Sequence, residues 1–363
     1  MDSHGTSLYR EKKKKGDVWS FRYRDNGINR KVRIGVCSLM TKKEAREACE
    51  KLREKNNREN NCPRTVADLV AHYRKHELPK KAYSTREAYD TYLDIWILPK
   101  WGTKLYDSVK TMQVEDWLGS IERPNGTRSK IRNIMSAVWT HAQRHEFSDK
   151  NPIAFVRQSA KRESTAPVLT AEETMALLRQ LQDPCHTAVF LAACTGLRIS
   201  ELFALKWEDV RFDVGEIHPV RGIVDNHVGD LKTDASGRAI PIDIALASIL
   251  MDWRGRCPYN QNGDYIFASP DMKGTQPYWP DTMLHKKIKP AAKCAGISKV
   301  VGWASFRSTY ATLLHANSES IKTTQDLMRH ANSKVTMDFY AQSIPAERRA
   351  AQAKVTAGFL GNN

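Results

Sequence analysis

Residues 195–210 read TGLRISELFALKWEDV and combine a turn, a cation and a short helix. An apolar helical segment precedes them, and their last residues favour a β-strand. Gly196 predicts the turn, so that Arg198 begins the helix, where the positive helix end and the guanidinium group both favour an anion. Taken alone the pattern is weak, because a surface salt bridge is the more common explanation for such an arginine.

Three later segments carry polar side chains that could also act on an anion. Lys232 lies in a predicted strand–turn–strand segment, where most lysines only contact water. Arg307 lies near the first turn of a helix predicted over 304–314. His330 and Tyr340 are ten residues apart, with a turn-like Asn-Ser pair between them.

The composition indicates a globular protein with a large positive charge. The chain has 363 residues, 41% of them hydrophobic, and 57 Lys and Arg against 41 Asp and Glu give a formal net charge of +16. This excess favours a polyanionic partner without choosing among DNA, RNA and acidic lipid. The longest uncharged apolar run, 188–194, is far shorter than the ~20 residues that cross a bilayer. Seven scattered cysteines without a C-x-x-C pair indicate a reducing compartment.

The N-terminal part has the alternation of a β-hairpin. Apolar and polar residues alternate on both sides of the turn pair Asn26-Gly27, and a helical stripe follows. Four cations share one face of this hairpin, namely Arg22, Arg24, Lys31 and Arg33. A solvated surface is the plain interpretation, but four cations on one face favour a nucleic-acid reader, since β-ribbons fit the DNA major groove. We expect a basic flexible arm over 1–16 and a DNA-binding module over 17–60.

The remaining chain divides by its periodicity. Residues 65–155 repeat an apolar i, i+3, i+4, i+7 pattern and predict an all-α domain, followed by a polar linker over 156–167. Residues 168–345 mix helices with short strands, and 346–363 predict an Ala-rich helical tail. Cations gather at the helix starts of the all-α domain. That they contact DNA and that they only keep the surface soluble are equally good interpretations of this pattern. The candidates are Lys81, Arg86, Lys130 and Arg128.

The order of the motifs resembles the tyrosine recombinase, or phage integrase, family. The resemblance rests on Arg198 in T-G-L-R-x-S-E, Lys232 in L-K-T, Arg307 in S-F-R-S-T-Y-A-T, and His330 with Tyr340 in L-M-R-H-(x9)-Y. It covers most of the chain. It implies a multidomain fold in which an α+β catalytic domain, mostly helical with a small antiparallel sheet, follows an all-α core-binding (SAM-like) domain and a small N-terminal hairpin-plus-helix module that binds arm-type sites.

The resemblance also implies the roles of these residues. Arg198 and Arg307 would fork onto the non-bridging oxygens of a phosphodiester, with His330 as a further donor. Tyr340 would attack phosphorus to give a 3′-phosphotyrosyl link and a free 5′-hydroxyl. Lys232 would protonate the leaving oxygen. The ester retains the bond energy, so we expect no cofactor.

Three further positions bear on whether the chain can cleave DNA at the full rate. Glu201 matches an acidic residue that we interpret as orienting the first arginine. Ala304 stands where the family usually has a histidine, and Arg329 stands where a glycine commonly precedes the third-motif histidine. Slowed cleavage is the hypothesis that follows, and the alternative function is a recombinase-like protein that binds DNA with impaired or lost cleavage.

Other classes of protein have weaker support. His72/His76 and His141/His145 have the i, i+4 spacing of zinc ligands, but neither pair contains the Glu of H-E-x-x-H and no cysteine cluster accompanies them, so we expect no metal site. No RNA-binding signature or phosphate-binding loop occurs.

The partners that the resemblance implies are double-stranded DNA at attachment sites and further copies of the chain, as a tetramer on DNA. A host DNA-bending protein or an excision factor would be additional partners. The tail from Ala346 is our hypothesis for the element exchanged between protomers. We expect a cytoplasmic, nucleoid-associated protein of prokaryotic or phage origin, without a membrane partner.

Overall fold

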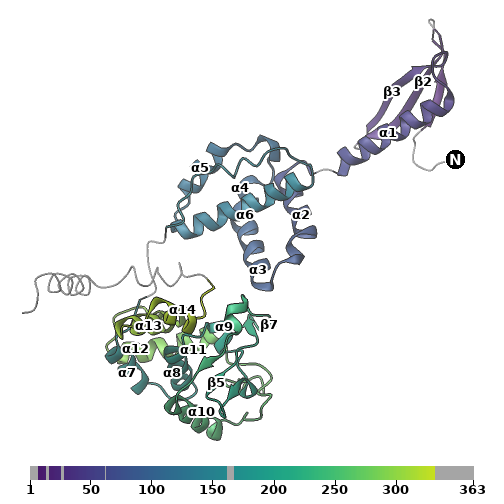
Figure 1. The fold of residues 1–363 in the computed structure, drawn as a ribbon. Coiled ribbons are helices and arrows are strands. Elements are labelled where there is room, and N and C mark those ends of the chain that lie inside the picture. The colour runs from purple at the N-terminus through teal and green to yellow at the C-terminus, as the bar shows by residue number, and fades with distance from the viewer. Residues whose placement is uncertain (1–6, 14–15, 26–27, 62, 162–166, 332–363) are drawn as a thin grey trace, which may run out of the picture. The chain divides into compact units, whose positions relative to one another are not determined.

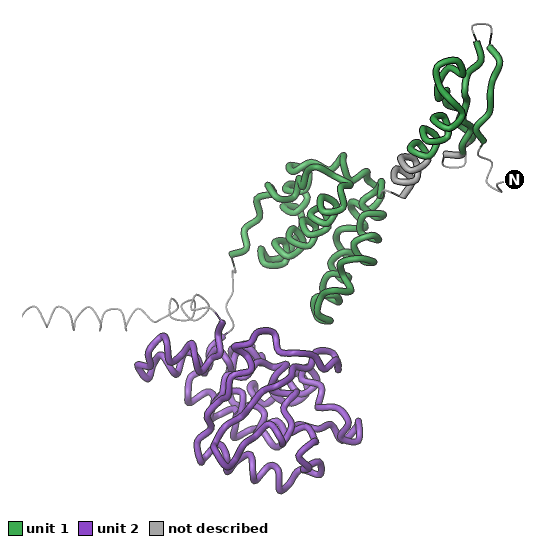
Figure 2. Tube along the Cα trace, turned by 45° about the vertical axis from the view of Figure 1, so that its right-hand side comes forward, with its two compact units in different colours: residues 1–163 green, residues 164–363 purple. Residues whose placement is uncertain are grey.

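The computed structural model describes residues 7–13, 16–25, 28–61, 63–161 and 167–331. The chain divides into two compact units, 1–163 and 164–363 (Figure 1, Figure 2). The boundary falls within the expected linker. Among the described residues, no helix has both the length and the apolar character needed to span a membrane.

The N-terminal part is an antiparallel sheet packed against a helix. The elements are β1 (Ser7–Glu11), β2 (Val18–Asp25), β3 (Ile28–Val36) and α1 (Lys42–Asn61). The strands pair in the order β1–β2–β3, which confirms the hairpin predicted for the last two. A capping box begins α1, because Thr41 Oγ1 accepts from the Glu44 amide (3.3 Å) and Glu44 Oε2 accepts from the Thr41 amide (2.8 Å). Ala45 of α1 and Phe21 of β2 are buried.

The first strand corrects one expectation. Residues 7–11, assigned to a basic flexible arm over 1–16, form β1 and pair with β2, so that Leu8 lies opposite Phe21 and Tyr9 opposite Ser20. A strand of five residues shows too few alternations to be seen in the sequence. It is stabilised instead by the otherwise unpaired edge of β2, which a local pattern does not reveal.

A helical bundle follows, as the all-α expectation requires. Its helices are α2 (Val66–His76), α3 (Tyr83–Tyr92), α4 (Leu98–Trp101), α5 (Thr111–Ser120) and α6 (Asn125–Arg144), with the 3₁₀ turns η1 (Leu78–Lys80) and η3 (Tyr106–Ser108) and the π-helical segment η2 (Leu93–Ile97). Thr65 caps α2 through the Asp68 amide. The bundle has a core of its own, in which Leu69, Trp101 and Trp139 are at most 1% exposed.

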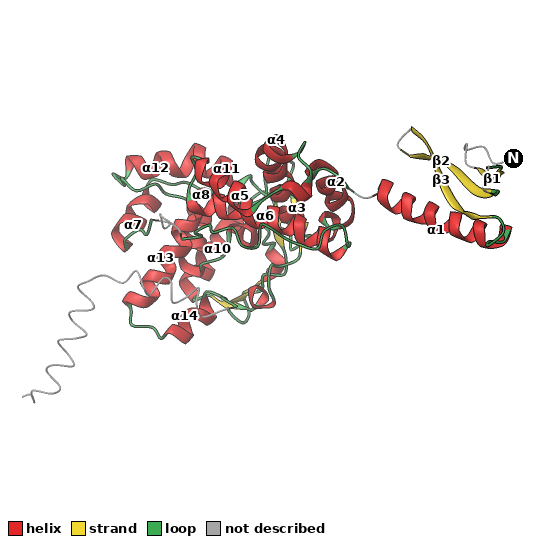
Figure 3. Ribbon diagram, turned by 90° about the horizontal axis from the view of Figure 1, so that it is seen from above, coloured by secondary structure: helices red, strands yellow, loops and turns green. Residues whose placement is uncertain are grey.

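The second unit is mostly helical, with short strands (Figure 3). Its helices are α7 (Ala171–Arg179), α8 (Cys185–Thr195), α9 (Ile199–Leu202), α10 (Ile244–Arg256), α11 (Pro280–Met283), α12 (Lys289–Cys294), α13 (Trp303–Ala316) and α14 (Ile321–Leu327). Its strands are β4 (Val210–Arg211), β5 (Glu216–Ile217), β6 (Gly222–Val224), β7 (His227–Gly229) and β8 (Ile240–Pro241). It also has the 3₁₀ turns η4 (Trp207–Asp209) and η5 (Asp234–Gly237) and the π-helical segment η6 (Leu284–Ile288). The α+β class is confirmed.

The strands of this unit form two small antiparallel sheets, one in the order β4–β5–β8 and one of β6 with β7. The segment around Lys232 therefore differs from the expected strand–turn–strand. The chain leaves β7, passes the exposed Lys232 and makes the 3₁₀ turn η5 before β8. The turn forms here because its small residues allow Ser236 to be buried, where its backbone carbonyl and hydroxyl accept hydrogen bonds from arginines.

Candidate active site

Arg198 stands at a sharp turn between α8 and α9. Gly196 ends α8 with φ of 60°, and a Cβ there would lie 2.6 Å from Tyr310 Cδ1, so the position requires glycine. Arg198 then caps α9, its amide donating to Glu201 Oε2 (3.1 Å) and its Nη1 to Glu201 Oε1 (2.8 Å). The turn thus holds the guanidinium group beside the N-terminus of α9.

Glu201 lies between two arginines in the interior. Its side chain is 3% exposed, and Oε2 accepts from Arg329 Nη2 at 2.5 Å while Oε1 accepts from Arg198. Burial opposes ionisation of this carboxyl group, but Arg329 and Arg198 outweigh it and lower the pKa of Glu201. The carboxylate therefore stays charged and fixes both guanidinium groups.

Arg307 reaches the same turn from α13. Its Nη1 donates to the Gly196 carbonyl and its Nη2 to the Met328 carbonyl (2.7 Å). Burial and the neighbouring Arg198 lower the pKa of Arg307 to about 9. These two acceptors are carbonyl oxygens, which orient the side chain without neutralising its charge.

His330 lies just beyond α14 and is 5% exposed. Its amide donates to the Gln325 carbonyl (3.1 Å), and Gln325 Nε2 donates back to the His330 carbonyl (3.2 Å). Burial, then Arg307 and Arg198, lower the pKa of His330 to about 4. The imidazole is therefore neutral at pH 7 and can donate a single N–H.

Arg329 has a role that the sequence did not reveal. Its φ of 51° is left-handed, which gives the physical reason why glycine is common at this position of the family. The side chain, 1% exposed, donates from Nη1 to the Ser236 carbonyl (2.6 Å) and from Nη2 to Glu201. Left-handed backbone costs about 1–2 kcal/mol for a residue other than glycine, and these charged hydrogen bonds offset it. In the sequence, the only sign of this role was that an arginine stands where the family commonly has a glycine.

Ser236 is a second residue that sequence reasoning missed. It is fully buried in η5, and its Oγ accepts from Arg198 Nη1 (2.8 Å) and lies 3.0 Å from Thr233 Oγ1. The segment that carries the exposed Lys232 is therefore tied to Arg198. A serine four residues after a candidate lysine is too common a pattern to have indicated this contact.

The degenerate position Ala304 is described, whereas the predicted nucleophile is not. Ala304 is exposed on the first turn of α13, three residues before Arg307, so both lie on one side of the helix. Tyr340 and the tail over 346–363 lie outside the described residues, and so does the side chain of Arg24.

The predicted cationic face of the N-terminal hairpin is present for the described side chains. Arg22 lies opposite Lys31 and Arg33 opposite Ser20 across β2 and β3, and the three cations are exposed. Tyr9 of β1 adds an aromatic ring, with the Arg22 and Lys31 cations each 5.8 Å from its centroid. Cations interleaved with an aromatic ring suit contact with a nucleic-acid backbone and its bases.

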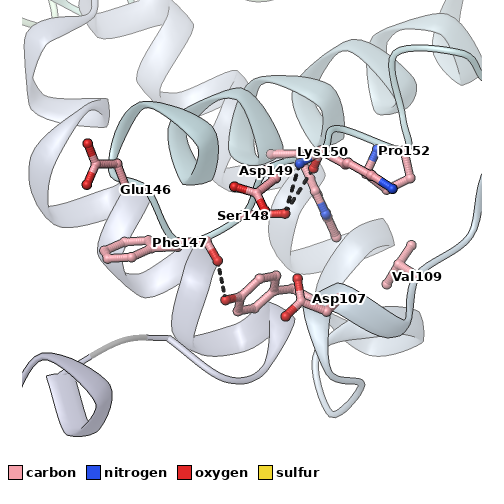
Figure 4. A pocket seen from close by; sticks show the side chains of 10 residues that line it. Asp107, Val109, Glu146, Phe147, Ser148, Asp149, Lys150 and Pro152 are labelled. Carbon is pink, nitrogen blue, oxygen red and sulfur yellow. Dashed lines mark hydrogen bonds between the residues drawn. The ribbon is translucent and has the colours of Figure 1, made fainter. Parts of the chain in front are cut away.

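The cations of the helical bundle contact their neighbours. Lys81 lies over the Tyr89 ring and Arg86 over the Tyr83 ring, at 5.3 and 5.9 Å. Arg128 Nη2 donates to Asn125 Oδ1 (2.7 Å), whereas Lys130 is exposed. A cavity of about 430 Å³ in this bundle is lined by other residues, and there Tyr106 donates to the Phe147 carbonyl at 2.6 Å (Figure 4).

The second unit gathers several cationic side chains around one buried carboxylate. Arg198, Arg307 and Arg329 converge with His330 around Glu201, from α9, α13 and the end of α14. As far as the chain is described, the positive charges of this cluster exceed the negative one. Two forked guanidinium groups with a neutral imidazole suit the oxygens of a phosphate diester.

The comparisons with known proteins agree with this geometry. The profile of the phage integrase family matches residues 167–347. The chain is 24% identical over 272 residues to the tyrosine recombinase XerC-like protein of Caldanaerobacter subterraneus, covering 66% of this chain and 69% of that one. It is 27% identical over 235 residues to the tyrosine recombinase XerD of Halalkalibacterium halodurans, covering 61% and 73%.

Solved structures share the fold. The Tn1549 transposon integrase in complex with transposon right end DNA superposes with a TM-score of 0.68 at 20% identity, covering 81% of this chain and all of that one. The lambda integrase dimer bound to a COC′ core site superposes with a TM-score of 0.62 at 19% identity, covering 93% of this chain and 95% of that one.

The chain belongs to the phage integrase family, the tyrosine recombinases. It is a site-specific recombinase that cleaves and rejoins DNA strands. The alternative of a protein with impaired or lost cleavage, raised by Ala304, is not favoured by these comparisons.

Proposed function

We propose that the cluster around Glu201 binds the scissile phosphate of duplex DNA. The observation that carries this proposal is the pair Arg198 and Arg307, brought together from distant segments and oriented by Glu201 and by backbone carbonyls. Each guanidinium group donates to one or two oxygens of the phosphate, and His330 donates a third hydrogen bond. Burial strengthens these contacts, because the local dielectric constant is lower than that of water.

The reaction that we propose exchanges one phosphate ester for another. The Tyr340 hydroxyl releases its proton to water as its oxygen forms a bond to phosphorus, the bond from phosphorus to the 5′-oxygen breaks, and Lys232 supplies the proton to the leaving oxygen. Charge that gathers on the non-bridging oxygens is stabilised by Arg198 and Arg307. A general acid of this kind contributes roughly 10²–10⁴ in rate. Rejoining is the reverse reaction with a different 5′-hydroxyl, so no external energy source is consumed.

The same proposal includes the arrangement on DNA. A lambda integrase has been solved as a dimer on a core site and as a tetramer on a Holliday junction. We infer that this chain acts as a homotetramer on two duplexes, with segments 17–60 and 65–155 holding DNA and 168–345 carrying catalysis. Host DNA-bending and excision factors would act on that complex, within the nucleoid of a prokaryotic cell.

Covalent trapping tests the reaction. A nicked suicide duplex that carries the attachment site is incubated with the full chain, and protein–DNA adducts are separated under denaturing conditions. We expect an adduct that Tyr340→Phe abolishes. The control is Tyr265→Phe, which should still form the adduct; Tyr265 is another tyrosine of the second unit, and Lys206 lies over its ring. An adduct that persists in Tyr340→Phe would refute the assignment of the nucleophile.

A further inference from the structure

Four histidines come together where α2 and α6 pack in the helical bundle. His72 and His76 lie on α2, and His141 and His145 lie on α6 and at its C-terminal cap. The His72 ring centroid is 4.3 Å from that of His76, 5.1 Å from that of His141 and 5.0 Å from that of His145, and the His141 and His145 centroids are 4.3 Å apart. Each i, i+4 pair alone was weak evidence, but the structure places the two pairs side by side.

The ring nitrogens of these histidines fit a metal ion. His72, His141 and His145 each offer a nitrogen within 4.8 Å of the other two, and His72 Nδ1 is 2.8 Å from His141 Nε2. Two nitrogens bound to tetrahedral zinc at 2.0–2.1 Å lie about 3.3 Å apart. A small rotation of the rings therefore suffices. We propose that His72, His141 and His145 bind one divalent transition-metal ion, with Zn²⁺ the ion of best fit.

An unsatisfied polar atom supports the same conclusion. His141 Nδ1 is buried without a hydrogen-bond partner among the described residues, and Glu77 Oε1 lies 3.9 Å from it. Without a metal, the proton between His72 and His141 satisfies one contact and leaves Nδ1 unpaired whichever ring carries it. With a metal on Nε2, the proton stays on Nδ1 and faces the Glu77 carboxylate. Carboxylate–histidine–metal arrangements of this kind orient the ring and strengthen binding.

Aromatic side chains pack against two of the proposed ligands. Phe147 packs edge-on against His72 (5.0 Å between centroids) and Tyr73 packs edge-on against His141 (5.4 Å). These aromatic rings restrict rotation of the ligands.

The ion would act as a structural cross-link. His72 and His141 are 69 residues apart in the chain. A shared ion would therefore join two helices between which most of the bundle's sequence lies. Metal bound to the native state but not to an unfolded site stabilises the fold by mass action. The site lies in the first unit and takes no part in the strand-transfer chemistry proposed for the second.

The test uses the full chain without an affinity tag, reduced and freed of metal by EDTA. Zn²⁺ is titrated in competition with a chromophoric chelator, and Co²⁺ is added separately to record the visible absorption of a tetrahedral complex. We expect one Zn²⁺ per chain, a tetrahedral Co²⁺ spectrum, and a melting temperature that rises with Zn²⁺ concentration.

Variants decide whether the histidines are the ligands. His145→Ala replaces an exposed ligand, so its metal-free fold can be checked by circular dichroism before titration. We expect His145→Ala to weaken Zn²⁺ binding at least tenfold and Glu77→Gln to weaken it about 10–100-fold. The control His285→Ala, an exposed histidine of the second unit, should bind as the parent chain does. Absence of stoichiometric binding in the parent, or binding that His145→Ala leaves unchanged, overturns the proposal.

Discussion

Replacing Glu201 by glutamine keeps the shape of the side chain and removes the negative charge that faces Arg198 and Arg329. Arg329 is 1% exposed and cannot turn toward water, so its guanidinium group would remain buried without a counter-charge. The introduced glutamine could still accept one hydrogen bond but would also direct an amide group at a second guanidinium. We therefore expect the variant to keep the native fold but to have a lower free energy of unfolding.

The size of the effect follows from burial. Breaking a buried ion pair by removing one partner costs about 3–5 kcal/mol. In a unit of this size each kcal/mol lowers Tm by about 2–4 °C, so the melting temperature of the second unit should fall by roughly 10 °C. Arg198, released from Glu201 Oε1, would also lose its fixed orientation, and strand cleavage should slow even at temperatures where the unit is folded.

Chemical denaturation of the full chain measures the free energy, and the suicide-duplex assay measures cleavage. Glu208→Gln is the matched control, because Glu208 pairs with Arg221 at 3.3 Å but its side chain is 49% exposed, and it should cost at most about 1 kcal/mol. Adding Arg329→Gly to Glu201→Gln removes the uncompensated charge and should recover part of the stability. A Glu201→Gln chain within about 1 kcal/mol of the parent would refute this electrostatic account.

Three further outcomes are expected. The pKa of His330 is about 4 in the folded protein and about 6.5 in the unfolded chain. Between about pH 4 and about 6.5 the unfolded chain therefore binds a proton at His330 that the folded protein does not. Stability should then fall as pH drops through this window, by up to about 1.4 kcal/mol per pH unit, and His330→Gln should flatten the slope in denaturation curves. Gly196→Ala should destabilise the second unit, because its Cβ meets the Tyr310 ring at 2.6 Å, and Tyr310→Leu should restore part of the Tm. Arg33→Ala, which removes an exposed cation of the hairpin, should reduce the salt slope of DNA binding, measured by fluorescence anisotropy, by about 0.9.

Local signals explain what the sequence could predict. The turn at Gly196 and the helix start at Arg198 depend on neighbouring residues, and so does the alternation that predicted the hairpin. Contacts between distant segments could not be predicted in this way. Ser236 reaches Arg198 across 38 residues and Arg329 reaches Glu201 across 128, and no spacing rule connects them.

The same limit applies to the histidines and to the first strand. The i, i+4 spacing placed each histidine pair on one helix face, but only the packing of α2 on α6 brings the pairs together. The strand β1 needs β2 as its partner, so its five residues carry little signal alone. The family resemblance supplied the order of the proposed catalytic residues, and their roles, like the position of Tyr340, stay a prediction.

The two carbonyls that hold Arg307 have a consequence for timing. Because the Gly196 and Met328 carbonyls already orient this side chain in the protein alone, the guanidinium group that we propose for phosphate binding needs little rearrangement when a duplex enters. In the proposed reaction, Arg307 therefore cannot itself serve as a checkpoint. Restraint of premature cutting would fall on delivery of the attacking phenol.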